Sequence, residues 1–302
     1  MFHTPQGKAA VVRGGLRVAI VVIVSGFLFR TLYLGWGEIV AYHWSLDYLA
    51  LIIAFLLVLL AAAFYAYLWK LILVRLGNPL SYRKSFRIFF LSQLGRYIPG
   101  KIWGILGLVY LSGREGISQA ISGASIILQL MLQVVSGVML FILTLPFWRE
   151  IPVLVGLYPV LFLFPLGLLL LHPTFLRRGF DFALRLVGQK PVDLNWGYGY
   201  LLGQLALWGS FWVIQGLASY HLIKAISNSP PPFPVVTGIF AIAWVVGFVS
   251  LLTPSGLGVV EGTLTLLLSF YLPLYVAIII ALLTRLLRTA GDLVCAAIAW
   301  KL

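Results

Sequence analysis

Long apolar runs dominate this chain and restrict it to folds that suit a lipid bilayer. Six uninterrupted segments reach the roughly 20 apolar residues that a membrane-crossing helix requires. They lie at about residues 16–37, 48–75, 117–145, 151–171, 198–225 and 273–300. The 302 residues are 62% hydrophobic and 10% charged, whereas soluble domains carry about 25% charged residues. The sequence therefore predicts an all-α integral membrane protein in which residues 1–302 form a single polytopic domain.

Two further apolar segments, about 86–111 and 235–271, are interrupted by short polar stretches rich in glycine and proline. The stretches are Gly95-Arg96-Tyr97-Ile98-Pro99-Gly100-Lys101 and Pro254-Ser255-Gly256-Leu257-Gly258-Val259-Val260-Glu261-Gly262. Each leaves two half-segments too short to cross a bilayer alone, about 86–94 and 101–111, and about 240–252 and 263–271. An unpaired backbone group in lipid costs several kcal/mol unless protein or a wet cavity surrounds it. We therefore expect about six transmembrane helices plus two re-entrant broken-helix hairpins.

The basic residues support this topology. With a cytoplasmic N-terminus and hairpins that do not cross, 14 of the 21 lysines and arginines fall in cytoplasmic segments and only two, Arg149 and Lys224, in outer segments. The other five lie within the membrane: Arg30, Arg96, Lys101, Arg285 and Arg288. Cytoplasmic loops of membrane proteins carry such an excess. The sequence predicts a multi-pass protein of the cytoplasmic (inner) membrane with both termini in the cytoplasm. Because these loops account for the net charge of +13, that charge does not indicate nucleic-acid binding.

The same topology predicts an inverted repeat. The units are about 48–145 and 198–300, each a helix, a hairpin and a second helix, and the single helix 151–171 links them. One connecting helix inverts the second unit relative to the first. Inverted repeats whose broken helices meet near the bilayer midplane are typical of transporters.

At the first break, Arg96 and Lys101 flank a turn formed by Gly95, Pro99 and Gly100. A helix N-terminus near Lys101 favours an anion, and both cations can contact phosphate oxygens. Tyr97 and Trp103 can line the headgroup region. The alternative is a shallow hairpin whose two cations extend to the membrane surface.

At the second break, Pro254, Gly256, Gly258 and Gly262 permit a non-helical backbone around a single acid, Glu261. An ionisable residue at membrane depth is a candidate for function. Glu261 can contact a headgroup, bind a proton or form a structural ion pair with an arginine; these alternatives stay open.

The last apolar segment places Arg285, Arg288 and Asp292 on one helical face, since residues three and four apart are neighbours. We expect Arg288 and Asp292 to satisfy each other, which leaves Arg285 freer for an anion. In the alternative, Arg285 lies near the interface and extends to the surface.

Other polar residues give no catalytic set. His3, His43, His172 and His221 fall near span ends or termini, so we expect no Ser-His-Asp site, no metal and no cofactor. Gln129 and Gln133, four apart on one helix face, are typical of hydrogen bonds between membrane helices. We expect the tryptophans and tyrosines to lie mainly at the membrane interfaces.

Both breaks resemble motifs of one family. Residues 94–104, with Gly95-Arg96-Tyr97, Pro99-Gly100-Lys101 and Trp103-Gly104, resemble the GRYxPGKxWG signature of the flippase-like membrane domain of lysylphosphatidylglycerol synthases and their small stand-alone relatives. Residues 254–262 resemble the second motif, P-x-G-L-G-x-x-E-G. The resemblance covers most of the chain. It implies lipid translocation, or service to the synthesis of glycosyl- or aminoacyl-lipids.

Synthases of this family carry a soluble aminoacyl-transferase domain after the membrane part, whereas this chain ends at Leu302. We therefore expect no lysyl transfer by this polypeptide, and no enzyme activity. The leading hypothesis is a transporter that moves or binds an anionic phospholipid or a polyprenyl-phosphate-linked sugar. The alternative is a non-transporting accessory subunit whose partner is a glycosyltransferase or a lipid-modifying enzyme.

Overall fold

The computed structural model describes residues 26, 30, 33, 34, 36–42, 44, 46–97, 103–148, 174, 177, 178, 181, 185, 197–227, 229–250 and 256–302. In this part of the chain helices alternate with short turns and no strand occurs. The predicted all-α class is therefore confirmed.

Four of the described helices are long and apolar enough to cross a membrane. They are α3 (Tyr48–Arg75), α6 (Gln119–Thr144), α10 (Tyr198–Ile226) and α13 (Leu274–Lys301). A turn of 3-10 helix, η2 (Leu145–Phe147), extends α6. Their bounds lie close to the four spans predicted in these regions. Of the other two predicted spans, 151–171 lies outside the described residues, and 16–37 does so except for single positions and the start of the short helix α2 (Trp36–Ala41).

Side chains and backbone bonds fix the ends of α3. Asp47 accepts a hydrogen bond from the amide of Ala50 (3.0 Å), which satisfies one of the four unpaired donors at the helix start. At the other end, the amide of Asn78 donates to the carbonyl of Leu73 (3.0 Å) across Gly77, whose φ is 77°. This left-handed glycine is a common helix terminator. It lets the chain turn sharply into the first hairpin.

Shorter helices flank each predicted break. In the first hairpin they are α4 (Tyr82–Gln93), the 3-10 turn η1 (Leu94–Tyr97) and α5 (Trp103–Arg114), and in the second they are α11 (Phe233–Val249) and α12 (Val259–Leu268). The 12 residues of α4 rise about 18 Å, less than the roughly 30 Å of a hydrocarbon core. Both arms of each hairpin pack against each other.

Two hairpin arms start earlier than expected. Ser81 caps α4 by accepting a hydrogen bond from the amide of Lys84 (3.4 Å), so the helix includes polar residues ahead of the apolar run. Pro234 lies in the first turn of α11, where its missing N–H leaves no bond unmade. Apolar runs therefore underestimate how far these helices extend.

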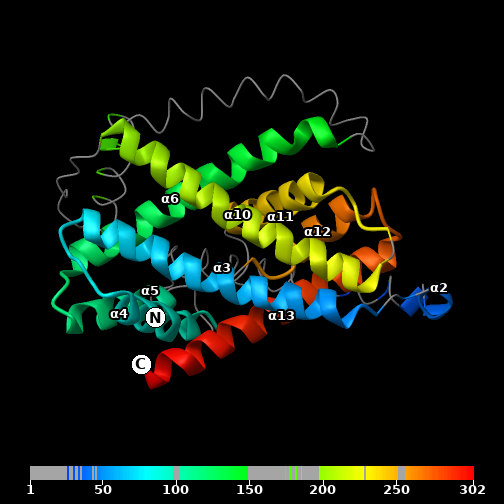
Figure 1. Ribbon diagram of the computed structural model, residues 1–302, viewed down its shortest axis with the longest axis horizontal. Helices are drawn as coiled ribbons and strands as arrows, with labels where there is room; N and C mark the ends of the chain where they lie inside the picture. The colour runs from blue at the N-terminus through cyan, green and yellow to red at the C-terminus, as the bar shows by residue number, and fades with distance from the viewer. Residues whose placement is uncertain are drawn as a thin grey trace, which may run out of the picture.

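Helices α3 and α10 pack side by side at the centre, with α6 and α13 on opposite sides of them (Figure 1). Contacts in the first predicted unit recur in the second: α3 with α4 and α10 with α11, α5 with α6 and α12 with α13. Contacts between the units also recur in pairs, since α4 packs on α13 and α11 on α6. A two-fold axis between α3 and α10 would generate this pattern. The inverted repeat itself stays a prediction.

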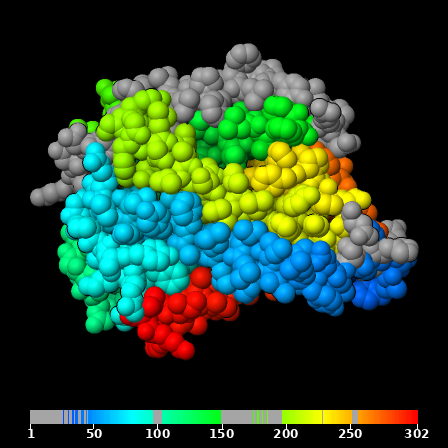
Figure 2. All heavy atoms as spheres, in the orientation of Figure 1, coloured from blue at the N-terminus to red at the C-terminus, as the bar shows by residue number. Residues whose placement is uncertain are grey.

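The outer surface of α3 is apolar, as expected beside lipid tails. Leu49, Ile52, Leu56 and Leu60 recur at helical spacing and are more than half exposed. Figure 2 shows this helix, in blue, running along one face of the molecule.

Several tryptophans lie in the core instead of at the surface. Trp69, Trp148 and Trp208 are 0% exposed. Hydroxyl groups make this burial possible for two of them: the indole N–H of Trp69 donates to Ser125 Oγ (3.0 Å) and that of Trp148 to Thr144 Oγ1 (3.1 Å). These two residues depart from the expected interfacial belt because a serine and a threonine inside the bundle supply the acceptors that the membrane interface would otherwise provide.

Candidate functional site

Glycines shape the second break. Gly256 and Gly258 have φ of 68° and 81°, which side chains rarely tolerate. A Cβ added to Gly256 would also lie 3.3 Å from the Cα and carbonyl oxygen of Gly247 in α11. Glycine at position 256 therefore allows the backbone just before α12 to pass close to α11. Gly262 is already helical, its amide donating to the carbonyl of Gly258 (2.8 Å), and Pro254 lies outside the described residues.

Glu261 joins this break to α13. It is the third residue of α12 and 4% exposed. One carboxylate oxygen accepts the amide N–H of Gly258 (2.7 Å), and the other accepts from Nη1 of Arg285. The positive end of the α12 dipole also favours a carboxylate here. A buried acid therefore has a backbone donor, a guanidinium and a helix terminus around it.

The ion pair corresponds to one of the three alternatives given for Glu261 and bears directly on the expectation for Arg285. It confirms that Glu261 can pair with an arginine, and the expectation that Arg285 is freer for an anion is wrong. The physical reason is that a carboxylate 4% exposed needs a compensating charge, and Arg285 supplies it. The side chain of Arg285 remains 33% exposed.

One turn further along α13, Arg288 faces a small cavity. The cavity has a volume of about 50 Å³, enough for a few water molecules, and α3, α10, α11 and α12 supply the rest of its wall. Its lining is mainly apolar and aromatic, with Gln215, Ser219 and Thr284 as further polar residues. Asp292 lies one turn beyond Arg288 and is partly buried. In this conformation the cavity is too small for a lipid headgroup.

The first break is described up to Tyr97 and again from Trp103. A Cβ on Gly95 would lie 2.7 Å from the amide nitrogen of Gly104, so only glycine lets η1 lie against the start of α5. Helix α13 packs against η1 as well as against α12. The helix that carries both arginines therefore lies beside both broken segments.

Roles of the other first-break residues stay predictions. The backbone of Arg96 and Tyr97 belongs to η1, and Pro99, Gly100 and Lys101 lie outside the described residues. Trp103 begins α5 and is 47% exposed, as a residue beside lipid would be.

Polar side chains of α6 bind neighbouring helices, as Gln133 was predicted to do. Its side-chain oxygen accepts from the hydroxyl of Tyr65 in α3 (2.7 Å). One turn along, Ser136 Oγ accepts from the indole N–H of Trp212 in α10 (3.0 Å). Within the described ranges, no group of three His, Cys, Asp or Glu residues could hold a metal ion.

This architecture, with apolar spanning helices and two broken hairpins beside a charged helix, defines a multi-pass membrane protein. Residues 16–295 match the family described as the lysylphosphatidylglycerol synthase TM region, and the chain belongs to this family. The family that the sequence was found to resemble is thereby confirmed. No curated protein matches the chain. Family membership relates the protein to lipid handling.

Proposed function

We propose that this protein is a flippase-like transporter that moves an anionic phospholipid or a lipid-linked phosphate between the leaflets of the cytoplasmic membrane. The observation that carries the proposal is the position of α13. It packs against both broken hairpins, pairs Arg285 with the buried Glu261, and presents Arg288 to a cavity. Charges at membrane depth are costly and usually serve a transport path.

The two arginines take different roles in this proposal. Arg285 is already neutralised by Glu261, so it holds the second hairpin against α13. Arg288 lines the cavity together with hydroxyl and amide side chains, and a guanidinium binds a phosphate with two parallel hydrogen bonds. The cavity must widen to admit a headgroup. The hairpin arms can move relative to α13 to do so, while acyl or prenyl chains stay in lipid.

Re-entrance of the first hairpin is supported by an ion pair at its open end. Nζ of Lys84, at the start of α4, lies 2.6 Å from Oε2 of Glu115, just after the end of α5. The start of α4 and the end of α5 therefore lie at the same depth. Exposed basic residues gather there, which favours the cytoplasmic side: Arg83, Lys84, Arg87 and Arg114.

The alternative function is an accessory subunit that binds a lipid-linked sugar or a glycosyltransferase without moving a lipid. The small volume of the cavity favours it, because about 50 Å³ suits a static polar contact better than a transport path.

Leaflet exchange in liposomes tests the proposal. The purified protein is reconstituted with fluorescent phosphatidylglycerol or with a fluorescent polyprenyl phosphate, and a membrane-impermeant quencher measures exchange. We expect the native protein to exchange lipid between leaflets. The exchange rate should fall about tenfold in Arg288→Gln, because this change removes one charge-assisted contact. The rate should stay at the native value in Lys84→Gln. The control removes an exposed cation that does not line the cavity.

The outcomes separate the hypotheses. Absence of exchange with either lipid contradicts the transporter, and co-purification of a glycosyltransferase would then support the accessory role. Native exchange rates in Arg288→Gln and Arg96→Gln would refute the site while leaving transport itself intact.

A further inference from the structure

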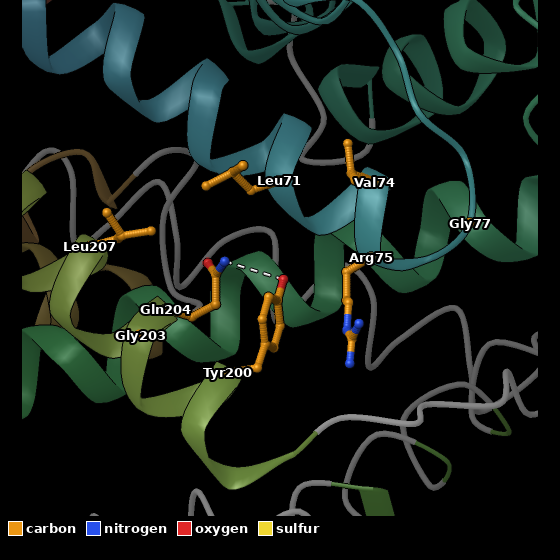
Figure 3. A pocket seen from close by; sticks show the side chains of 8 residues that line it. All are labelled: Leu71, Val74, Arg75, Gly77, Tyr200, Gly203, Gln204 and Leu207. Atoms are coloured by element: carbon orange, nitrogen blue, oxygen red, sulfur yellow. Dashed lines mark hydrogen bonds between the residues drawn. The ribbon is translucent and has the colours of Figure 1, made fainter.

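A second, larger pocket lies where α3 ends and α10 begins. It has a volume of about 610 Å³, within the range of sites for small ligands. Figure 3 shows the last turns of α3 and the first turns of α10 on its two sides. Val58, which lines the cavity near Arg288, lies 17 residues before Arg75 on α3, so about 25 Å separates the two sites along the helix. The pocket is therefore distinct from the candidate transport site.

Its polar wall is a row of three side chains from two helices. The guanidinium of Arg75 lies over the ring of Tyr200, 5.1 Å from the ring centre, and Nε2 of Gln204 donates to the hydroxyl of Tyr200 (3.2 Å). Figure 3 shows the three side by side. Stacking uses the face of a guanidinium, whereas its five N–H donors point outward in the plane and can serve more than one acceptor.

Gln204 gives an independent sign that the pocket takes a polar ligand. The residue is 3% exposed, and its side-chain oxygen is buried without a hydrogen-bond partner among the residues that the structure describes. Buried polar atoms are normally satisfied by protein, water or ligand. A ligand with a hydrogen-bond donor near its anionic group would satisfy this oxygen while Arg75 holds the anion.

The remaining wall is apolar and open. Leu71, Val74 and Leu207 supply hydrocarbon surface beside Arg75. Two glycines, Gly77 and Gly203, leave free space, since a Cβ at either would meet no heavy atom within 4 Å in the described part of the chain. The pocket therefore combines an anion-binding edge with a surface for an alkyl chain.

Helix length places this pocket at headgroup level. The 28 residues of α3 extend about 42 Å, which matches the 40–45 Å of a bilayer with its headgroups. Arg75, the last residue of α3, then lies among lipid phosphates. We infer that the pocket binds the phosphate headgroup of a membrane lipid on Arg75, Tyr200 and Gln204, with the adjoining acyl chain against Leu71, Val74 and Leu207. The inference goes beyond the proposed transport function and does not rest on it.

Binding of short-chain lipids to the purified protein in maltoside micelles tests the inference, with native mass spectrometry as the readout. The probes are dioctanoyl phosphatidic acid, dioctanoyl phosphatidylglycerol, dioctanoylglycerol and inorganic phosphate. We expect both phospholipids to bind, with phosphatidylglycerol tighter because its hydroxyls can reach Gln204. We expect dioctanoylglycerol and inorganic phosphate to bind at least about tenfold more weakly, since each lacks one half of the recognised chemistry.

Matched variants connect this binding to the pocket. Arg75→Gln removes the cation, and Gly203→Phe fills the space, so each should weaken phospholipid binding about tenfold or more. Lys70→Gln is the control for charge, because Lys70 lies over Tyr67 on the same helix and does not line the pocket. Gly209→Phe is the control for bulk, because Gly209 lies on α10, also has free space, and is outside the pocket. Both controls should bind like the native protein.

Three results would overturn the inference. Inorganic phosphate that binds as tightly as the phospholipids would indicate a plain anion site. Dioctanoylglycerol that binds as tightly would remove any role for the phosphate. Equal binding by Arg75→Gln, Gly203→Phe and their controls would place the lipid elsewhere. These ligand comparisons use the native protein and need no transport, so their failure differs from a failure of leaflet exchange.

Discussion

Replacement of Glu261 by glutamine tests how the second hairpin is held. The change keeps the shape of the side chain, but one acceptor oxygen now faces two donors, the amide of Gly258 and the guanidinium of Arg285. A lost hydrogen bond to a charged group costs about 1.5–3 kcal/mol. Because the Arg285 side chain is 33% exposed, water can partly solvate it, and the loss stays below the roughly 3–5 kcal/mol of a broken, fully buried pair. We expect Glu261→Gln to lower the free energy of unfolding by about 2–3 kcal/mol.

Thermal unfolding in detergent, followed by the circular dichroism of the helices, measures this loss. At this chain length about 1 kcal/mol corresponds to roughly 2 °C, so the midpoint should fall by about 4–6 °C. Arg285→Gln should cost a similar amount, and the double variant should cost less than the sum by about 1 kcal/mol or more. Glu115→Gln, in an exposed pair, is the control and should shift the midpoint by less than about 2 °C. A midpoint for Glu261→Gln within about 1 °C of the native one, or fully additive losses, would refute the reasoning.

The same measurement checks three further substitutions. Gly95→Ala should lower the melting temperature by about 4 °C or more, because its Cβ would lie 2.7 Å from the backbone of Gly104. The control Gly123→Ala, at a position with free space, should leave the melting temperature unchanged. Equal shifts in the two variants would contradict the close contact at Gly95. Lys84→Ala removes an exposed ion pair and should cost less than about 1 kcal/mol; a larger loss would mean that the pair holds the first hairpin. Gly258→Ala forces a side chain to φ of 81° and should cost about 1–3 kcal/mol; an unchanged midpoint would show that this turn relaxes freely.

Much of the fold follows from the sequence because the bilayer leaves few choices. An apolar run such as 48–75 can satisfy its backbone only as a helix, and Asp47 and Gly77 mark its ends in the sequence itself. Glycine and proline likewise locate the two breaks. The start of α4 at Tyr82 was not foreseen, because a serine cap extends a helix into polar sequence that hydropathy does not count.

Side-chain partners were harder to foresee than helices. Spacing on one helix suggested that Arg288 pairs with Asp292 and leaves Arg285 for an anion. Burial changes the outcome for Arg285: Glu261 comes from another helix and takes Arg285 as its partner. The pocket at Arg75 was missed for the same reason, since Tyr200 and Gln204 lie more than 120 residues further along the chain. Its weak sequence signal was an arginine at the end of an apolar run, two residues before a glycine.

Burial of the tryptophans gives the protein a built-in optical reporter. Acyl chains that carry bromine quench an indole only on contact, so they should spare Trp148 and Trp208, at 0% exposed, and reach Trp103, at 47%. Trp212 and Trp244 line the cavity beside Arg288. Any conformation that opens this cavity to water or lipid would therefore shift their emission to longer wavelength or expose them to the quencher. The intrinsic fluorescence of the unlabelled protein thus distinguishes closed from open states.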